Sequence, residues 1–161
     1  MDSLCTFDLS TRDEPILEAE LKIFGFSSYM HPIGETHLLN VGPAGDNDGF
    51  SGESQSQLFD VSDLKNQKQV DTLLPSKLRE RAYSEAGWDH HALTSDPENR
   101  ILVTPIQGYG NNWDSQFSGF SVIALGTELN SLTKRGWIEH EGKLSPECEQ
   151  SLNEENSSRK F

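Results

Sequence analysis

The sequence predicts an all-β protein, a partial β-propeller of about two and a half four-stranded antiparallel blades. Two series of four short strand-like runs follow one another along the chain, and turn residues separate the runs. No segment shows the apolar spacing of a helix over three clean turns. A repeat of four strands in about 50 residues is typical of a propeller blade and unlike a helical solenoid.

The first complete blade is predicted at residues 25–74. Its four runs are 27–33, 37–41, 56–61 and 69–74. A second complete blade at 75–140 repeats the series with runs at 88–93, 101–106, 119–125 and 133–140.

Residues 1–24 supply only the last two strands of an incomplete blade, with runs at 4–9 and 16–23. The motif Phe7-Asp8-Leu9-Ser10 recurs as Phe59-Asp60-Val61-Ser62, and a strand-like run follows each copy. A helix over 14–23 is the alternative, because Glu, Leu and Ala are good helix formers, but the repeat favours a strand. Residues 141–161 are polar, acidic and aperiodic, which predicts a disordered tail.

Composition narrows the possible partners. The formal net charge of −13 argues against nucleic acid and disfavours an anionic membrane surface. It suits solubility, cation binding or a basic partner. No apolar run is long enough for a transmembrane segment, and the first residues lack the pattern of a signal peptide. Cys5 and Cys148 do not have zinc-ribbon spacing; a disulfide is open, but two unpaired thiols are favoured.

Three long connections are expected at 42–54, 75–87 and 107–118. In a meander, successive connections alternate between the two ends of the sheet, so all three fall on one rim. Long loops on a rigid scaffold commonly carry binding, and we expect this face to hold a protein, peptide or glycan ligand. The candidate ligand-binding residues are Tyr109, Asn111, Asn112, Trp113, Asp114, Trp88, Asp89, His90, His91 and His31.

One of these loops resembles part of a calcium loop. Asp46 and Asp48 alternate between glycines, and Glu53 follows shortly after. Ala44 and Gln55 stand where an EF-hand needs acidic residues, so a solvated acidic turn is the alternative. The loop at 108–114 mixes glycine, amides and aromatics, which suits stacking against sugars or peptides. A packing role for Trp113 is the alternative reading.

Trp88 is followed by Asp89, His90 and His91. Adjacent histidines on a regular strand point to opposite faces, so the sequence predicts that His90 and His91 do not share a metal ion. One of them could face the central channel near His31 and serve as a ligand, a base or a hydrogen-bonding strut. The alternative function is therefore a hydrolase or another metal-dependent enzyme using His31, Asp89, His90 and His91.

Three segments, YMHP at 29–32, LFDVSD at 58–63 and SEAGWDHHA at 84–92, occur in order. With them the chain resembles bacterial and archaeal secreted proteins with a C-terminal β-propeller domain, distant relatives of WD40-type propellers. The resemblance covers about residues 4–142. It implies an extracellular or cell-surface propeller and carries no catalytic residue to this chain.

Members of that group are longer, so we expect this chain to be a fragment. Its open strand ladders would associate with each other or with missing blades. The function expected is a non-enzymatic binding or scaffold module.

Overall fold

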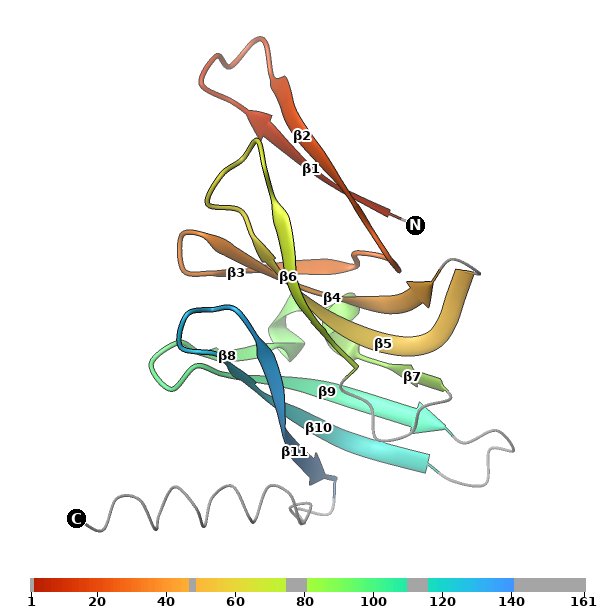
Figure 1. Ribbon diagram of the computed structural model, residues 1–161. Helices are drawn as coiled ribbons and strands as arrows, with labels where there is room; N and C mark the ends of the chain where they lie inside the picture. Colours follow the sequence, from red (N-terminus) through yellow and green to blue (C-terminus); the bar gives the residue numbers. More distant parts are fainter. Residues whose placement is uncertain (1, 47–48, 75–80, 110–115, 141–161) are drawn as a thin grey trace, which may run out of the picture.

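The computed structural model describes residues 2–46, 49–74, 81–109 and 116–140 (Figure 1). The described residues form antiparallel β-strands in three sheets, with two 3₁₀ turns. The prediction of an all-β partial propeller is confirmed. No helix among these residues has the length and hydropathy to cross a bilayer.

The first sheet consists of β1 (Asp2–Asp8) and β2 (Ile16–Ile23). They pair antiparallel from Asp2 opposite Ile23 to Asp8 opposite Ile16. The strand expected for β2 is therefore confirmed, and the helical alternative is wrong. Pairing with β1 outweighs the helix propensity of its Glu, Leu and Ala residues, as tertiary context often does.

The second sheet holds β3 (Tyr29–Ile33), β4 (His37–Asp46), β5 (Gly49–Asp60) and β6 (Lys68–Leu73) in chain order. The long loop expected at 42–54 is wrong, because β4 and β5 continue to pair from Gly42 opposite Gln55 to Asp46 opposite Gly49. Pro43 is accommodated where the pairing register shifts. Burial of Ala44 and Ser54 between sheets outweighs the turn-like composition.

The third sheet contains β9 (Ile101–Tyr109), β10 (Gln116–Leu125) and β11 (Leu132–Glu139). Its innermost position is shared by β7 (Arg81–Tyr83) and β8 (Thr94–Asp96), which pair with opposite ends of β9. The inner strand is thus interrupted.

Two 3₁₀ turns, η1 (Glu85–Gly87) and η2 (His90–Ala92), fill this interruption. The strand expected at 88–93 is therefore wrong, and the loop expected at 75–87 contains β7. The cause is local. The Ser84 hydroxyl accepts a hydrogen bond from the Ala86 N–H at 3.3 Å, and the Asp89 carboxylate accepts one from the His91 N–H at 2.9 Å. Such side-chain caps compete with strand pairing.

The same turn and the same irregularity recur from sheet to sheet. Asp8 accepts a hydrogen bond from the Ser10 N–H at 2.8 Å, and Asp60 accepts one from the Ser62 N–H at 2.9 Å. In the pairing of the last two strands of each sheet, the register shifts at Phe7, Phe59 and Ile123, as expected for a β-bulge. These three residues therefore occupy equivalent positions.

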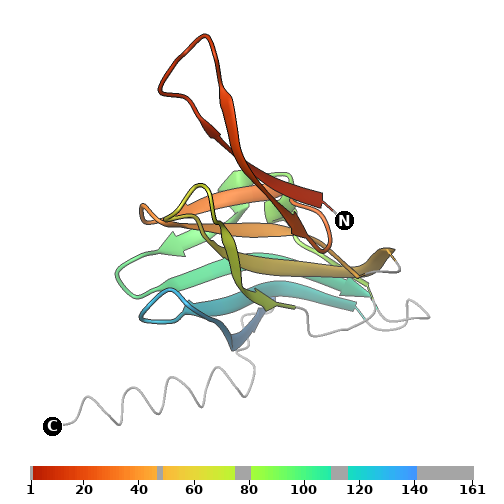
Figure 2. The ribbon, with the colours of Figure 1, turned by 45° about the horizontal axis from the view of Figure 1, so that its top comes forward.

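The sheets pack as successive layers (Figure 2), and apolar side chains fill the two interfaces. Phe59 is fully buried against Leu4 and Ile23 of the first sheet. On the other side, Leu58 belongs to the cluster that contains Leu102 and other residues of the third sheet. The stability of the module therefore depends on contacts between blades.

Two buried side-chain amides hold the segment that connects the first sheet to the second. The Phe24 carbonyl accepts hydrogen bonds from the side-chain amides of Gln55 and Gln57, at 2.8 and 3.1 Å. Gly42 permits this crossing, because a Cβ there would lie 2.0 Å from the Phe26 carbonyl oxygen.

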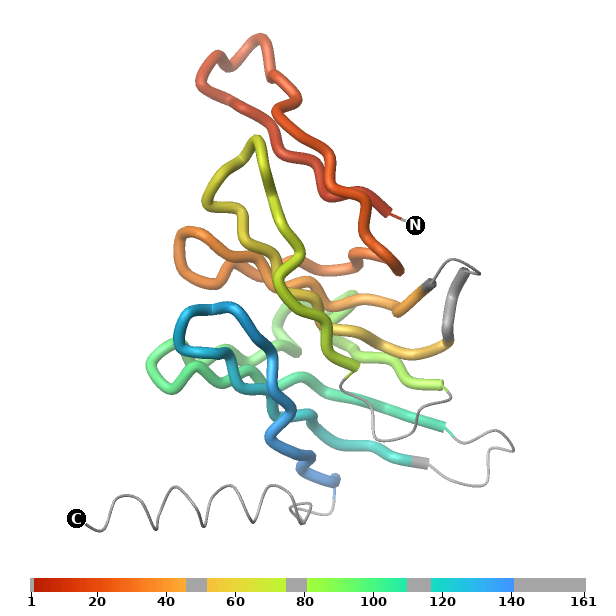
Figure 3. The backbone as a smooth tube through the Cα atoms, in the orientation of Figure 1, coloured from red at the N-terminus to blue at the C-terminus, as the bar shows by residue number. Residues whose placement is uncertain are grey.

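The connections alternate between two ends of the molecule. The turns that join β3 to β4, β5 to β6 and β10 to β11 lie on one side (Figure 3). The far end of β4, the start of β5 and the end of β9 lie on the opposite side (Figure 1).

Candidate functional site

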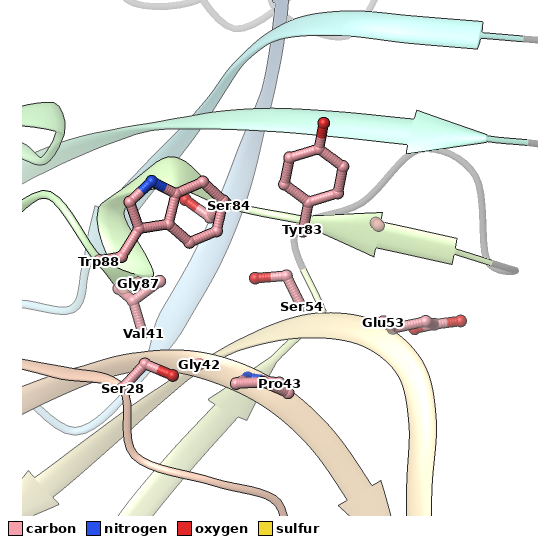
Figure 4. Close-up of a pocket in the computed structure, with 11 residues that line it drawn as sticks. Ser28, Val41, Gly42, Pro43, Glu53, Ser54, Tyr83, Ser84, Gly87 and Trp88 are labelled. Atoms are coloured by element: carbon pink, nitrogen blue, oxygen red, sulfur yellow. The ribbon is translucent and has the colours of Figure 1, made fainter.

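A cavity of about 100 Å³ lies between the second and third sheets. Val41 and Pro43 of β4 line it on one side, with Ser28 from the segment before β3. Ala82 of β7, Gly87 of η1 and Trp88 directly after η1 line it on the other side (Figure 4). Its wall is mostly apolar. The interruption of the inner strand brings residues of the third sheet to this position.

Three aromatic side chains form what we call the aromatic shelf: Tyr83, Trp88 and Tyr109. The Tyr83 ring lies 5.8 Å from that of Trp88 and 6.2 Å from that of Tyr109, measured between ring centroids. The Tyr83 and Tyr109 rings are stacked at 17°. Trp88 is 68% exposed, which is high for a large aromatic residue. Such a surface is suited to stacking against a planar or cationic group.

Hydroxyl groups hold the shelf in place. The Tyr83 hydroxyl donates a hydrogen bond to Gln107 Oε1 at 2.5 Å and lies 3.4 Å from the Tyr109 hydroxyl. The hydrogen bond with Tyr109 raises the pKa of Tyr83 above its ordinary value. The Tyr83 phenol therefore stays neutral at physiological pH and acts as a hydrogen-bonding group.

Ser84, which follows the shelf in sequence, has a structural role. It is buried, and its Oγ lies 2.6 Å from Oγ1 of Thr104. Ser27 makes the corresponding bond to Asn40 Oδ1 in the second sheet, at 2.8 Å. The Ser84 hydroxyl is thus engaged in holding the blade and is not placed as a nucleophile.

A cluster of Asp89, His90 and His91 follows Trp88. One potential ligand atom from each lies within 4.8 Å of the others. His91 Nδ1 is 3.1 Å from Asp89 Oδ1, and the His90 and His91 rings are 3.8 Å apart between centroids. The prediction that adjacent histidines diverge is wrong, because these residues lie in a 3₁₀ turn where the alternation of a strand does not apply. The hydrogen bond from the His91 N–H holds the pKa of Asp89 below its usual range.

His31 lies near this cluster and outside it. Its Nδ1 is 3.1 Å from the Tyr29 hydroxyl, so both side chains share one face of β3. The Tyr29 ring in turn lies 6.3 Å from the His90 ring. Partial burial lowers the pKa of His31. Tyr29 therefore separates His31 from the three clustered residues.

The sequence profile of the beta propeller domain matches residues 1–160. The chain belongs to the beta propeller domain family. It is 36% identical over 108 residues to an uncharacterised protein of Methanocaldococcus jannaschii, which covers 67% of this chain. It is 35% identical over 104 residues to an uncharacterised protein of Archaeoglobus fulgidus, which covers 65%. The matched region spans 16% and 15% of the length of these two relatives. No solved structure gives a significant match.

Within this propeller, the expected binding residues are only partly brought together. Trp88 and Tyr109 each lie beside Tyr83 in the aromatic shelf, and Tyr109 lies on β9 rather than in a loop. Asp89, His90 and His91 form the second group. Asn111, Asn112, Trp113 and Asp114 lie outside the described residues.

Two residues of the expected calcium loop, Asp46 and Glu53, lie in strands and not in a loop. Asp46 ends β4, Glu53 lies buried in β5 beside the cavity, and Asp48 lies outside the described residues. Calcium binding stays a prediction. Cys5 is exposed and unpaired in β1, and Cys148 lies outside the described residues.

Sequence reasoning missed Tyr83, the central residue of the shelf. It belongs to a strand of three residues, which is too short for alternation to be recognised. The available signal was an aromatic residue directly before Ser84, a residue type that often begins a turn.

Proposed function

We propose that this propeller module is a non-enzymatic binding domain that receives a basic segment of a protein partner on the aromatic shelf. The observation that carries the proposal is the exposure of Trp88 beside Tyr83, at the mouth of a cavity. Exposed Trp and Tyr rings provide large, rigid contact area at low entropic cost and recur in binding surfaces.

Charge favours a basic ligand. The chain has a formal net charge of −13, and the acidic residue Glu53 is among those that line the cavity. An Arg or Lys side chain over an aromatic face gains cation–π attraction, about 0.5–2 kcal/mol depending on its exposure. The acidic surface would also increase the rate of encounter with a cationic segment.

Cavity size favours a polymer over a free small molecule. Pockets for drug-sized ligands measure roughly 300–1,000 Å³, whereas this cavity measures about 100 Å³. It can receive one side chain, while the rest of the ligand lies across the shelf. A peptide segment fits both requirements.

The test is a titration of the chain with short peptides that contain Arg or Lys, and with matched peptides that carry Gln at those positions. We expect the basic peptides to bind more tightly and to weaken as salt is raised. Trp88→Ala should abolish the preference, and Trp88→Phe should retain part of it. Trp88 is largely exposed, so neither variant should disturb the fold.

Phe120→Ala serves as the control, because Phe120 is also an exposed aromatic residue but is not part of the aromatic shelf. It lies in β10, on the face opposite to that of the buried Ile123. Equal binding of basic and neutral peptides would contradict the proposal. Binding to a neutral glycan that is lost in Trp88→Ala would assign the shelf to sugars instead.

The place of action is part of the proposal. The resemblance to secreted propeller proteins supports a location outside the cell or at its surface. Protease treatment of intact cells that express the full-length protein tests this: a surface module is digested, and an enclosed one is protected until lysis.

A further inference from the structure

The η2 turn holds three metal-ligating side chains that the binding function does not use. Asp89, His90 and His91 each present a ligand atom, and these atoms lie within 4.8 Å of one another. We propose that these residues form a binding site for a divalent transition metal ion such as Zn²⁺, with one coordination position left open. The metal site and the aromatic shelf use different residues, so an experiment can reject either proposal and leave the other standing.

The backbone of the turn fixes the spacing of the ligands. The Asp89 N–H donates to the Glu85 carbonyl at 2.9 Å, which joins η2 to η1. The Ala92 N–H donates to the Asp89 carbonyl at 3.1 Å, which closes the turn itself. The Asp89 side chain accepts from the His91 N–H at 2.9 Å. The Asp89 carboxylate is therefore tied to the residue whose imidazole would share the metal.

The distances are close to those of a coordinated ion. Zinc binds imidazole nitrogen and carboxylate oxygen at about 2.0–2.2 Å, so two ligands of a tetrahedral ion are about 3.4 Å apart. His91 Nδ1 and Asp89 Oδ1 are already 3.1 Å apart. The His90 ligand atom lies within 4.8 Å of both, close enough for the three to converge on one ion.

The two imidazoles also favour a shared cation. Their ring centroids are 3.8 Å apart, so one ion between them can bind a nitrogen of each ring. The Asp89 carboxylate would balance part of its charge. Two imidazoles and one carboxylate suit zinc, copper or nickel better than calcium, which prefers an all-oxygen set.

The Tyr29 ring, from the preceding blade, lies beside the site. It lies 6.3 Å from the His90 ring, at the seam between the second and third sheets. His90 and His91 are otherwise exposed, so an ion can enter from solvent and the open position can accept water or a donor from a ligand.

The test is a calorimetric titration of the chelator-treated full chain with Zn²⁺. We expect one zinc ion per chain. His90→Ala and His91→Ala should each weaken binding by more than about 10-fold, since even groups that only orient metal ligands change affinity by 10–100-fold. Asp89→Asn should weaken binding while still capping the turn. In the wild type, the imidazole resonances of His90 and His91 should shift with zinc.

His37→Ala is the matched control, because His37 lies in β4 and interacts with the Thr36 hydroxyl. It should bind zinc like the wild type, and all variants should melt like the wild type in chelator. Absence of stoichiometric binding, or equal binding by the wild type and His91→Ala, would overturn the site. Loss of binding in Asp46→Ala alone would also overturn it and assign the metal to the acidic end of β4.

Discussion

The carboxylate of Asp71 in β6 accepts a hydrogen bond from the backbone N–H of Leu132 in β11 at 2.7 Å. This bond joins the outermost strands of two neighbouring blades. The second oxygen of Asp71 accepts from the Thr72 N–H at 2.8 Å, so both oxygens are engaged.

Asp71→Ala should therefore lower the free energy of unfolding by about 1.5–3 kcal/mol, the usual contribution of a hydrogen bond to a charged group. Urea unfolding measures the change. Asp13→Ala, which removes an exposed carboxylate from the connection between β1 and β2, should leave the free energy of unfolding nearly unchanged. Equal stability of both variants would mean that the bond does not hold the blades together.

The buried amide of Asn40 gives a second prediction. Its Nδ2 donates to Gln57 Oε1 at 2.9 Å, and its Oδ1 accepts from the Ser27 hydroxyl at 2.8 Å. Asn40→Ala leaves the Gln57 amide buried, and the Ser27 hydroxyl partly buried, without these bonds, which should cost about 1–3 kcal/mol. Thermal melting beside Asn66→Ala, an exposed turn position, measures the effect. A melting temperature that matches that of Asn66→Ala would show that water replaces the amide.

His31 should make stability depend on pH. Burial lowers its pKa in the folded chain below the ordinary value of 6.5, so below pH 6.5 the unfolded chain binds more protons than the folded one. Stability from this group is complete above pH 6.5 and is lost as pH falls toward the folded pKa. In metal-free buffer, the melting temperature of His31→Asn should fall less between pH 7.5 and about 5 than that of the wild type. An unchanged pH profile in the variant would assign the dependence to other groups.

The first sheet should drive self-association. Phe7 is 51% exposed, whereas its equivalent, Phe59, is fully buried against the preceding sheet. The neighbouring Leu17 is 54% exposed. The outer face of this sheet therefore has the character of an interface between blades.

Phe7→Gln with Leu17→Gln should shift the chain toward monomer, weakening association by about tenfold or more if roughly 1.5 kcal/mol of apolar burial is lost. Sedimentation velocity over a range of concentrations measures this. Leu64→Gln, an exposed apolar residue in the turn after β5, should leave association unchanged. Weakening by Leu64→Gln to the same extent would indicate unspecific apolar contact.

The fold could be predicted because its main signals are local and repeated. The Asp8 and Asp60 turns arise from the same short motif, and each directly precedes a strand that pairs back. In β3, Tyr29 and His31 are two residues apart and share one face, as the alternation of any strand requires. These features depend on neighbouring residues, so one sequence suffices to find them.

The site was harder to predict because it depends on contacts between sheets and on an interruption. The polar segment that includes Ser54 and Gln55 has the composition of a loop, yet it is buried between sheets as strand. The side-chain caps at Ser84 and Asp89 change the geometry of the two histidines, and strand periodicity does not anticipate this change.

The repeated bulge affects how readily a strand from another chain can pair with the outermost strand of each sheet. In each sheet the final strand carries one extra residue, at Glu18, Val70 and Arg135, so the ladder offered at the rim is uneven. An irregular rim is a poor template for an added strand, a device by which β proteins avoid runaway fibre growth. The bulges therefore disfavour pairing along the strand edges and leave the faces of the sheets able to pack. Concentrated solutions of this chain should form assemblies stacked face to face before they form amyloid-like ribbons.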